Sequence, residues 1–126
     1  MNLRLTLASI VLLGVAACGG GYSGSTPTSP STGGTNTQGS PISIVSGASI
    51  KTNTAYSPNP MVISAGGTVT WTNNDNTSHT SVGDDGSWNS GNIAPGAQFS
   101  RTFSTAGSYT YHCSIHPGMV GTVTVQ

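Results

Sequence analysis

The sequence predicts an all-β fold, an antiparallel β-sandwich of short strands, for residues Pro41–Gln126. Three observations predict it. Runs of four to six β-favouring residues recur along this segment, and breakers that contain glycine, proline or asparagine separate them. No stretch of the segment has apolar residues at helical spacing. Short strands with turn signals between them are typical of a sandwich that forms one small domain.

Six segments are expected to form strands, in chain order: Ile42–Val45, Met61–Ser64, Thr68–Asn73, Phe99–Ser104, Tyr109–Cys113 and Gly121–Gln126. In the third and sixth segments apolar side chains alternate with threonine, which places one face of each strand in the core. We therefore expect Val69 and Trp71 to be buried, with Val123 and Val125 opposite them.

The N-terminal segment Met1–Ala17 is typical of an export signal. Arg4 precedes an apolar run from Leu5 to Ala17 that is too short to span a bilayer as a helix. The run ends in Val15-Ala16-Ala17-Cys18, which resembles a bacterial lipobox. We therefore expect Cys18 to be lipidated and to hold the protein on a bacterial membrane outside the cytoplasm, in the periplasm or at the cell surface. Ordinary signal cleavage, which would release a soluble protein, is the alternative.

Residues 18–40 are expected to form the lipidated cysteine and a flexible linker. Gly19–Ser40 contains 7 glycines, 5 serines and 5 threonines among its 22 residues, and it has no charged residue. Such a composition buries too little apolar surface to offset the entropy lost on ordering. We therefore expect a disordered tether, with a glycosylated stalk as the alternative. Residues 41–126 then form the folded domain.

The charge composition argues against nucleic-acid binding. Charged residues make up 5% of the chain and the formal net charge is zero, so the basic surplus that phosphate backbones require is missing. The predicted domain has two basic and three acidic residues, too small an imbalance to steer a partner from a distance. Partner contacts should therefore be polar or apolar, and the lipid should be the only membrane attachment.

Soft metal ligands gather near the C-terminus. Cys113, His116 and Met119 place a thiol, an imidazole and a thioether within seven residues, where a predicted strand turns at Pro117-Gly118. If Cys18 is lipidated, Cys113 has no disulfide partner, and a lone thiol outside the cytoplasm is prone to oxidation unless it is buried or bound to metal. A buried inert thiol is the alternative for Cys113 alone. Sulfur and imidazole ligands together favour copper.

A trigonal copper site needs one more nitrogen, and the remaining histidines are His79 and His112. His112 precedes Cys113 on the same predicted strand, so its side chain should point to the opposite face. His79 follows the turn-rich segment Asn73–Ser78 and can approach from a separate loop. We therefore predict His79, Cys113 and His116 as metal ligands, with Met119 as the axial ligand.

Several motifs taken together resemble the cupredoxins, the blue-copper family that includes plastocyanin, pseudoazurin and amicyanin. The motifs are Tyr56–Pro60, Gly67–Asn73, His79-Thr80, Gly91–Gly96 and Tyr109–Met119, the last with the spacing Y-x-Y-x-C-x-x-H-x-x-M. This resemblance covers nearly all of Pro41–Gln126. It implies a Greek-key sandwich with one copper ion held near one end by His79, Cys113, His116 and, weakly, Met119.

The predicted ligand set indicates an electron carrier and not an enzyme. A rigid trigonal site with a long thioether bond suits both Cu(I) and Cu(II), so one electron can enter or leave with little rearrangement. We expect a monomeric type 1 copper protein that passes single electrons from a redox protein donor to an acceptor. A copper-trafficking or storage protein could use the same ligands and is the alternative. A multicopper oxidase or nitrite reductase domain would need further histidines.

Three residues beside the predicted ligands should tune the site. The Thr80 hydroxyl could reach Ser114 and so tie the two ligand loops together. Ile115 stands where plastocyanin and amicyanin have proline, so its backbone N–H is free to donate to the Cys113 sulfur. Such a hydrogen bond draws electron density from a thiolate and favours Cu(I).

Overall fold

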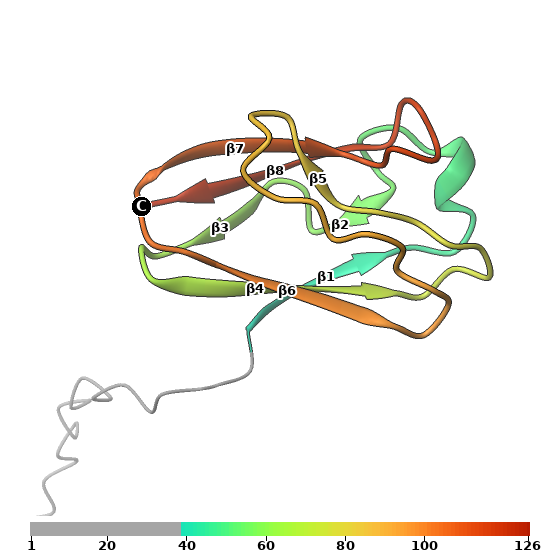
Figure 1. The fold of residues 1–126 in the computed structure, drawn as a ribbon, viewed down its shortest axis with the longest axis horizontal. Helices are drawn as coiled ribbons and strands as arrows, with labels where there is room; N and C mark the ends of the chain where they lie inside the picture. The colour runs from blue at the N-terminus through green and yellow to red at the C-terminus, as the bar shows by residue number, and fades with distance from the viewer. Residues whose placement is uncertain (1–38) are drawn as a thin grey trace, which may run out of the picture. The chain divides into compact units, whose positions relative to one another are not determined.

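Two four-stranded sheets pack face to face in the computed structural model, which describes residues 39–126 (Figure 1). The strands are β1 (Ser40–Ile44), β2 (Tyr56–Ser57), β3 (Met61–Ile63), β4 (Gly67–Asn73), β5 (Val82–Gly83), β6 (Gln98–Phe103), β7 (Gly107–His112) and β8 (Val120–Val125), and a short 3-10 helix, η1, spans Ala48–Ile50. One sheet has the order β2-β1-β4-β6 and the other the order β3-β8-β7-β5. The predicted all-β sandwich is therefore confirmed.

Each of the six predicted strands is present, with ends that lie within two residues of those expected. β1 begins at Ser40, one residue before the predicted start of the domain. β2, β5 and η1 were not expected, because segments of two or three residues are too short to show a periodic pattern. The predicted signal peptide, Cys18 and the linker up to residue 38 lie outside the described residues.

Both sheets are mixed, whereas the sequence predicts antiparallel pairing. β1 pairs in parallel with β4, and β3 pairs in parallel with β8. The pairs β4–β6 and β7–β8 are antiparallel, as expected, and the unexpected strand β5 also pairs antiparallel with β7. The alternation of side chains along one strand reports which face is buried and carries no information on the direction of the neighbouring strand.

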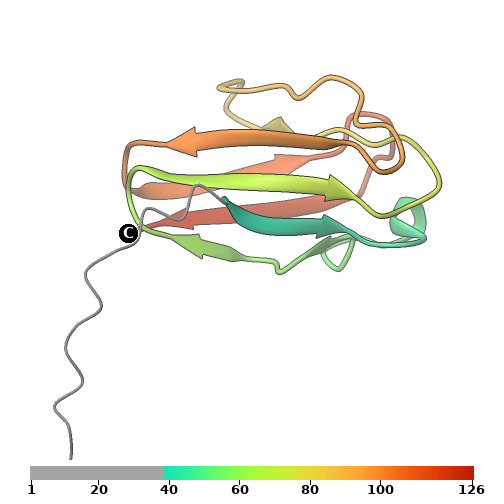
Figure 2. The same cartoon turned by 90° about the horizontal axis from the view of Figure 1, so that it is seen from below.

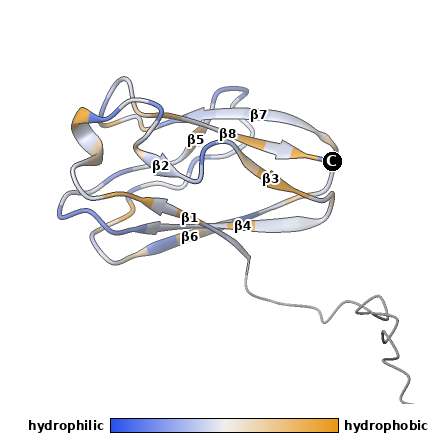
Figure 3. Cartoon of the chain, turned by 180° about the vertical axis from the view of Figure 1, so that it is seen from behind, coloured by the Kyte–Doolittle hydropathy of each residue, from blue (hydrophilic) through white to orange (hydrophobic). Residues whose placement is uncertain are grey.

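Trp71 of β4 lies at the centre of the core between the two sheets. Its ring is fully buried and packs against a set of aromatic rings, namely Trp88, Phe99, Phe103 and Tyr111. Val69 on the same strand is buried as predicted, and so are Val123 and Val125 on β8 of the opposite sheet. Parts of β1, β3 and β8 are coloured as apolar in Figure 3. These observations confirm the predicted core positions.

Three segments gather at one end of the sandwich, opposite the C-terminus (Figures 1 and 2). They are η1, residues 74–81 after β4, and residues 113–119 between β7 and β8. β4 and β7 both run toward this end, so the loops that follow them are brought together from the two sheets. The described part of the chain holds no helix of the length and hydropathy that a membrane crossing requires.

Two glycines let aromatic rings lie directly on the second sheet. A Cβ atom at Gly121 would lie 2.3 Å from Cζ of Tyr111, its partner across the β7–β8 pair. A Cβ atom at Gly83 would lie 2.4 Å from the Trp88 ring. Real Cβ atoms do not approach other atoms so closely, so both positions require glycine while the rings stay in place.

We predict that Gly121→Ala lowers the free energy of unfolding by ~1–3 kcal/mol, because the added methyl group overpacks the core against the Tyr111 ring. Urea unfolding measures the change. Thr122→Ala is the control, because Thr122 is the next residue on β8 and faces the other side of the sheet. It should cost about 1 kcal/mol or less. Equal losses in the two variants would contradict the close packing at Gly121.

Candidate metal centre

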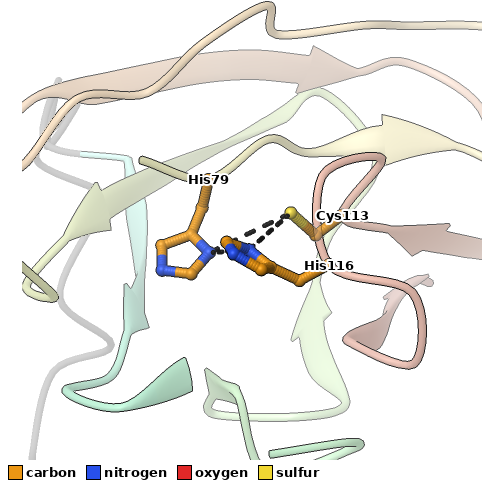
Figure 4. Close-up of side chains that lie close together, drawn as sticks. All are labelled: His79, Cys113 and His116. Atoms are coloured by element: carbon orange, nitrogen blue, oxygen red, sulfur yellow. Dashed lines mark hydrogen bonds between the residues drawn. The ribbon is translucent and has the colours of Figure 1, made fainter. Parts of the chain in front are cut away.

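Three side-chain donor atoms face one another where the loops meet (Figure 4). Nδ1 of His79 lies 3.1 Å from Nδ1 of His116. Sγ of Cys113 lies 4.0 Å from the first nitrogen and 3.8 Å from the second. The structure therefore brings together three of the four predicted ligands, from two segments that are 34 positions apart in the sequence.

The three atoms have the separations that a single metal ion needs. The point equidistant from all three in their plane lies about 2.1 Å from each, within the ~2.0–2.3 Å range of metal bonds to imidazole nitrogen and thiolate sulfur. Two imidazoles and one thiolate in a trigonal arrangement are the donor set of blue copper sites. These residues therefore fit a copper ion.

Met119 closes the loop that carries Cys113 and His116. Its carbonyl accepts a hydrogen bond from the Cys113 N–H at 3.0 Å, and its own N–H donates to the His116 carbonyl at 3.2 Å. Met119 is buried, with 1% of the residue exposed. Met119 thus belongs to the same short loop as two of the ligands, and its axial role stays a prediction.

The His79 side chain is held by its own loop. The His79 backbone forms a two-bond bridge with Ile93, with N–O distances of 3.1 and 2.8 Å. The buried Asn73 amide at the end of β4 donates to the carbonyls of Thr77 and Ile93, both at 2.8 Å. The His79 N–H and carbonyl are both hydrogen-bonded to Ile93, and the His79 ring is fully buried. The imidazole therefore has little freedom to move.

Thr80 ties the two ligand loops together, as expected. Its hydroxyl oxygen accepts a hydrogen bond from the Ser114 N–H at 2.8 Å and lies 3.1 Å from the Ser114 hydroxyl. The predicted contact between Thr80 and Ser114 is therefore present. Tyr56 of β2 adds a further support, because its hydroxyl donates to the Thr80 carbonyl at 2.7 Å and burial raises its pKa. The neutral hydroxyl remains a donor.

The sulfur of Cys113 accepts hydrogen bonds from Thr80 and not from Ile115. The Thr80 N–H donates at 3.4 Å and the Thr80 hydroxyl lies at 3.7 Å. Within residues 39–126 the donation expected from the Ile115 N–H is not formed, so that expectation is wrong for this structure. Ile115 lies in the turn after Cys113 and is 48% exposed, whereas Thr80 follows His79 directly and lies against the sulfur.

The His112 side chain points away from His79, Cys113 and His116, as alternation along its strand predicts. The Cys113 residue is 1% exposed, whereas the neighbouring His112 side chain is 40% exposed. Nδ1 of His112 forms a hydrogen bond with the Asp84 carboxylate on the outer side of the sheet. Alternation along β7 therefore sends the two side chains to opposite faces.

Asp75 is a buried residue that contacts His79 and that was not expected at the site. Oδ2 of Asp75 lies 2.9 Å from Nε2 of His79, on the edge of the ring that faces away from the cluster. Hydrogen bonds from the Gly47 N–H and from His79 hold the pKa of Asp75 well below its ordinary value. Asp75 lies four positions before the predicted ligand His79, and this spacing is the pattern from which the contact could have been predicted.

A family model, known relatives and solved structures all match this domain. Residues 43–126 match a family model described as copper binding proteins of the plastocyanin/azurin family. A plastocyanin from Scenedesmus fuscus is 40% identical over 84 residues, covering 56% of this chain and 86% of the relative. A purple cupredoxin from Nitrosopumilus maritimus aligns with a TM-score of 0.64 and 37% identity, over 69% of this chain and 99% of that chain. An amicyanin mutant in the reduced Cu(I) form aligns with a TM-score of 0.58 and 26% identity, over 70% of this chain and 82% of that chain.

We predict that Thr80→Val lowers the free energy of unfolding of the metal-free protein by ~1–3 kcal/mol, because it leaves the Ser114 N–H without its partner. Thr80→Ser is the matched control, since it keeps the hydroxyl and should lose clearly less. Urea unfolding of the two variants measures the difference. A Val variant as stable as the Ser variant would show that the hydroxyl does not tie the loops.

Proposed function

This chain belongs to the plastocyanin/azurin family of copper-binding proteins and binds one copper ion, and on that premise we propose that it carries single electrons between redox proteins. The observation that supports this most strongly is the donor triangle of His79, Cys113 and His116. Its atoms already have the separations of a trigonal site, so a change in the charge of the ion requires little movement of the protein.

The four predicted ligands have separate roles in this proposal. His79 and Cys113, both buried, would hold the ion from two loops, and Met119 would offer its thioether as the predicted fourth ligand. His116 is the more exposed imidazole and provides the path from the ion to a docked donor or acceptor. Copper supplies the one-electron change between Cu(II) and Cu(I). The protein's own part is to hold the donor atoms still and to exclude water from the buried side.

Copper trafficking or storage is the second candidate, because it would use the same ligands. Burial of His79 and Cys113 argues against it, since a metal held between two tied loops should exchange slowly. The two functions differ in measurable rates. A carrier should show fast electron self-exchange and slow copper transfer to a chelator, and a trafficking protein should show the reverse.

We predict that the purified protein binds one equivalent of Cu(II) with an intense visible absorption band, that ascorbate bleaches the band, and that voltammetry shows a reversible one-electron wave. Cys113→Ser should abolish the band because the thiolate is lost. His112→Ala is the matched control, since it changes the adjacent residue on the opposite face and should keep the band. A colourless cupric form, or loss of copper on each reduction, would exclude the carrier function.

We propose that residues 1–17 form a signal peptide, that Cys18 is lipidated and followed by a flexible linker that ends before β1, and that the folded domain is a monomer. The lipobox-like Val15–Cys18 and the composition of the linker support this arrangement outside the cytoplasm, attached to a bacterial membrane.

Cys18→Ser should move the protein from the membrane fraction to the soluble fraction, because the residue that carries the lipid is lost. Cys113→Ser, which changes the other cysteine of the chain, should leave it with the membrane. Fractionation followed by mass spectrometry of the N-terminal peptide reads out both variants. Membrane attachment that survives Cys18→Ser would rule out this anchor.

A further inference from the structure

Behind His79, on the side away from the ligand cluster, lies a buried carboxylate. The Asp75 side chain is 3% exposed and the His79 side chain is fully buried. Oδ2 of Asp75 lies 2.9 Å from Nε2 of His79, while Nδ1 of the same ring faces His116 and Cys113. The imidazole therefore stands between a buried carboxylate and the metal site.

Among residues 39–126, every polar contact of the Asp75 carboxylate comes from a group able to donate. The donors to Oδ1 are the backbone N–H groups of Gly47 at 3.0 Å and Asn76 at 2.9 Å. The donors to Oδ2 are the Ala48 N–H at 3.1 Å, the Thr77 hydroxyl at 3.3 Å and the His79 ring. A carboxylate surrounded only by donors is an acceptor at both oxygens and carries a full negative charge.

No Lys or Arg in the described part of the chain forms an ion pair with Asp75. The two basic side chains of the domain are engaged elsewhere. Lys51 donates to the Ser46 carbonyl, and Arg101 lies over the rings of Trp88 and Phe103. Within residues 39–126, no basic side chain therefore cancels the negative charge of Asp75.

We propose that Asp75 is a positioning residue that fixes His79 as the Nε2–H tautomer, keeps its Nδ1 lone pair turned toward the metal, and lowers the reduction potential of the copper. The inference rests on the proposed copper function of the same site. It adds one residue, and the sign of that residue's effect, to the four predicted ligands.

The tautomer follows from the charge. A carboxylate anion can only accept, so Nε2, the nitrogen that faces it, carries a proton, and in the neutral ring that proton is the only one. Nδ1 then carries the free lone pair at the point where the three donor atoms meet. The carboxylate thus selects, before any metal binds, the form of the imidazole that can coordinate it.

The effect on the potential follows from the same charge. Reduction of Cu(II) to Cu(I) removes one positive charge from the site, and a nearby anion stabilises the more positive state. Burial keeps water from screening the interaction. Removal of the negative charge should therefore favour Cu(I) and raise the potential.

The first test uses the full-length, metal-free wild-type protein and needs neither copper nor a variant. Long-range 1H–15N correlation spectra assign the tautomer of each histidine ring. His79 should carry its proton on Nε2, with slow exchange into solvent because the ring is buried. A proton on Nδ1, or rapid averaging between the two tautomers, would overturn the positioning role.

The second test is voltammetry of the copper-loaded variants Asp75→Asn and Asp85→Asn. The control also removes one negative charge, but from an exposed carboxylate. At a given ambient potential, Asp75→Asn should raise the ratio of Cu(I) to Cu(II) by about tenfold, which is ~59 mV for one electron. Asp75→Glu keeps the charge and should stay nearer the wild type. A shift in Asp75→Asn no larger than in Asp85→Asn would overturn the electrostatic role.

The outcomes separate this inference from the proposed function. If the wild-type protein cycles copper and the Asp75 variants behave like the control, the inference fails and the carrier function stands. If the protein binds no redox-active copper, the carrier function fails, and the tautomer spectrum still decides whether Asp75 positions His79. If Asp75→Asn does not fold, the wild-type spectrum and Asp75→Glu remain as the tests.

Discussion

The close approach of two imidazole nitrogens and one thiol sulfur is the constraint on which the rest of the structure depends. The fold holds these three atoms 3.1–4.0 Å from one another. The fold does so by supplying two loops from opposite sheets and by joining them through Thr80 and Ser114. The β-sandwich thus fixes the separations of the three donor atoms at one of its ends.

The supports of the two loops differ in kind, and so do the roles of the two histidines. His79 is anchored by a backbone bridge to Ile93 and by the Asp75 carboxylate, and no part of it reaches solvent. His116 sits on the short loop that Cys113 and Met119 close, and it is partly exposed. One imidazole is therefore suited to fixing the geometry of the site, and the other to connecting it with a partner.

Local patterns in the sequence predicted much of this arrangement. Alternation along a strand identified Val69 and Trp71 as core residues and separated His112 from Cys113, since side-chain direction depends only on neighbouring positions. Other features depend on residues far apart in the chain. The parallel strand pairs, and the contact of Asp75 with Gly47 28 positions away, produce no repeating pattern of residues in the sequence from which they could be predicted. The Cys113 sulfur accepts its hydrogen bond from Thr80, because the three-dimensional fold, and not the spacing of residues in the sequence, decides which loop lies against the sulfur.

High-resolution crystal structures of the protein without metal and with Cu(II) test the central claim most directly. If the site is built in advance, the donor atoms of His79, Cys113 and His116 keep the same separations in both structures, near 3.1, 3.8 and 4.0 Å. A metal-free structure in which the His79 ring has turned away, or in which the Cys113 sulfur occupies another rotamer, would contradict the account.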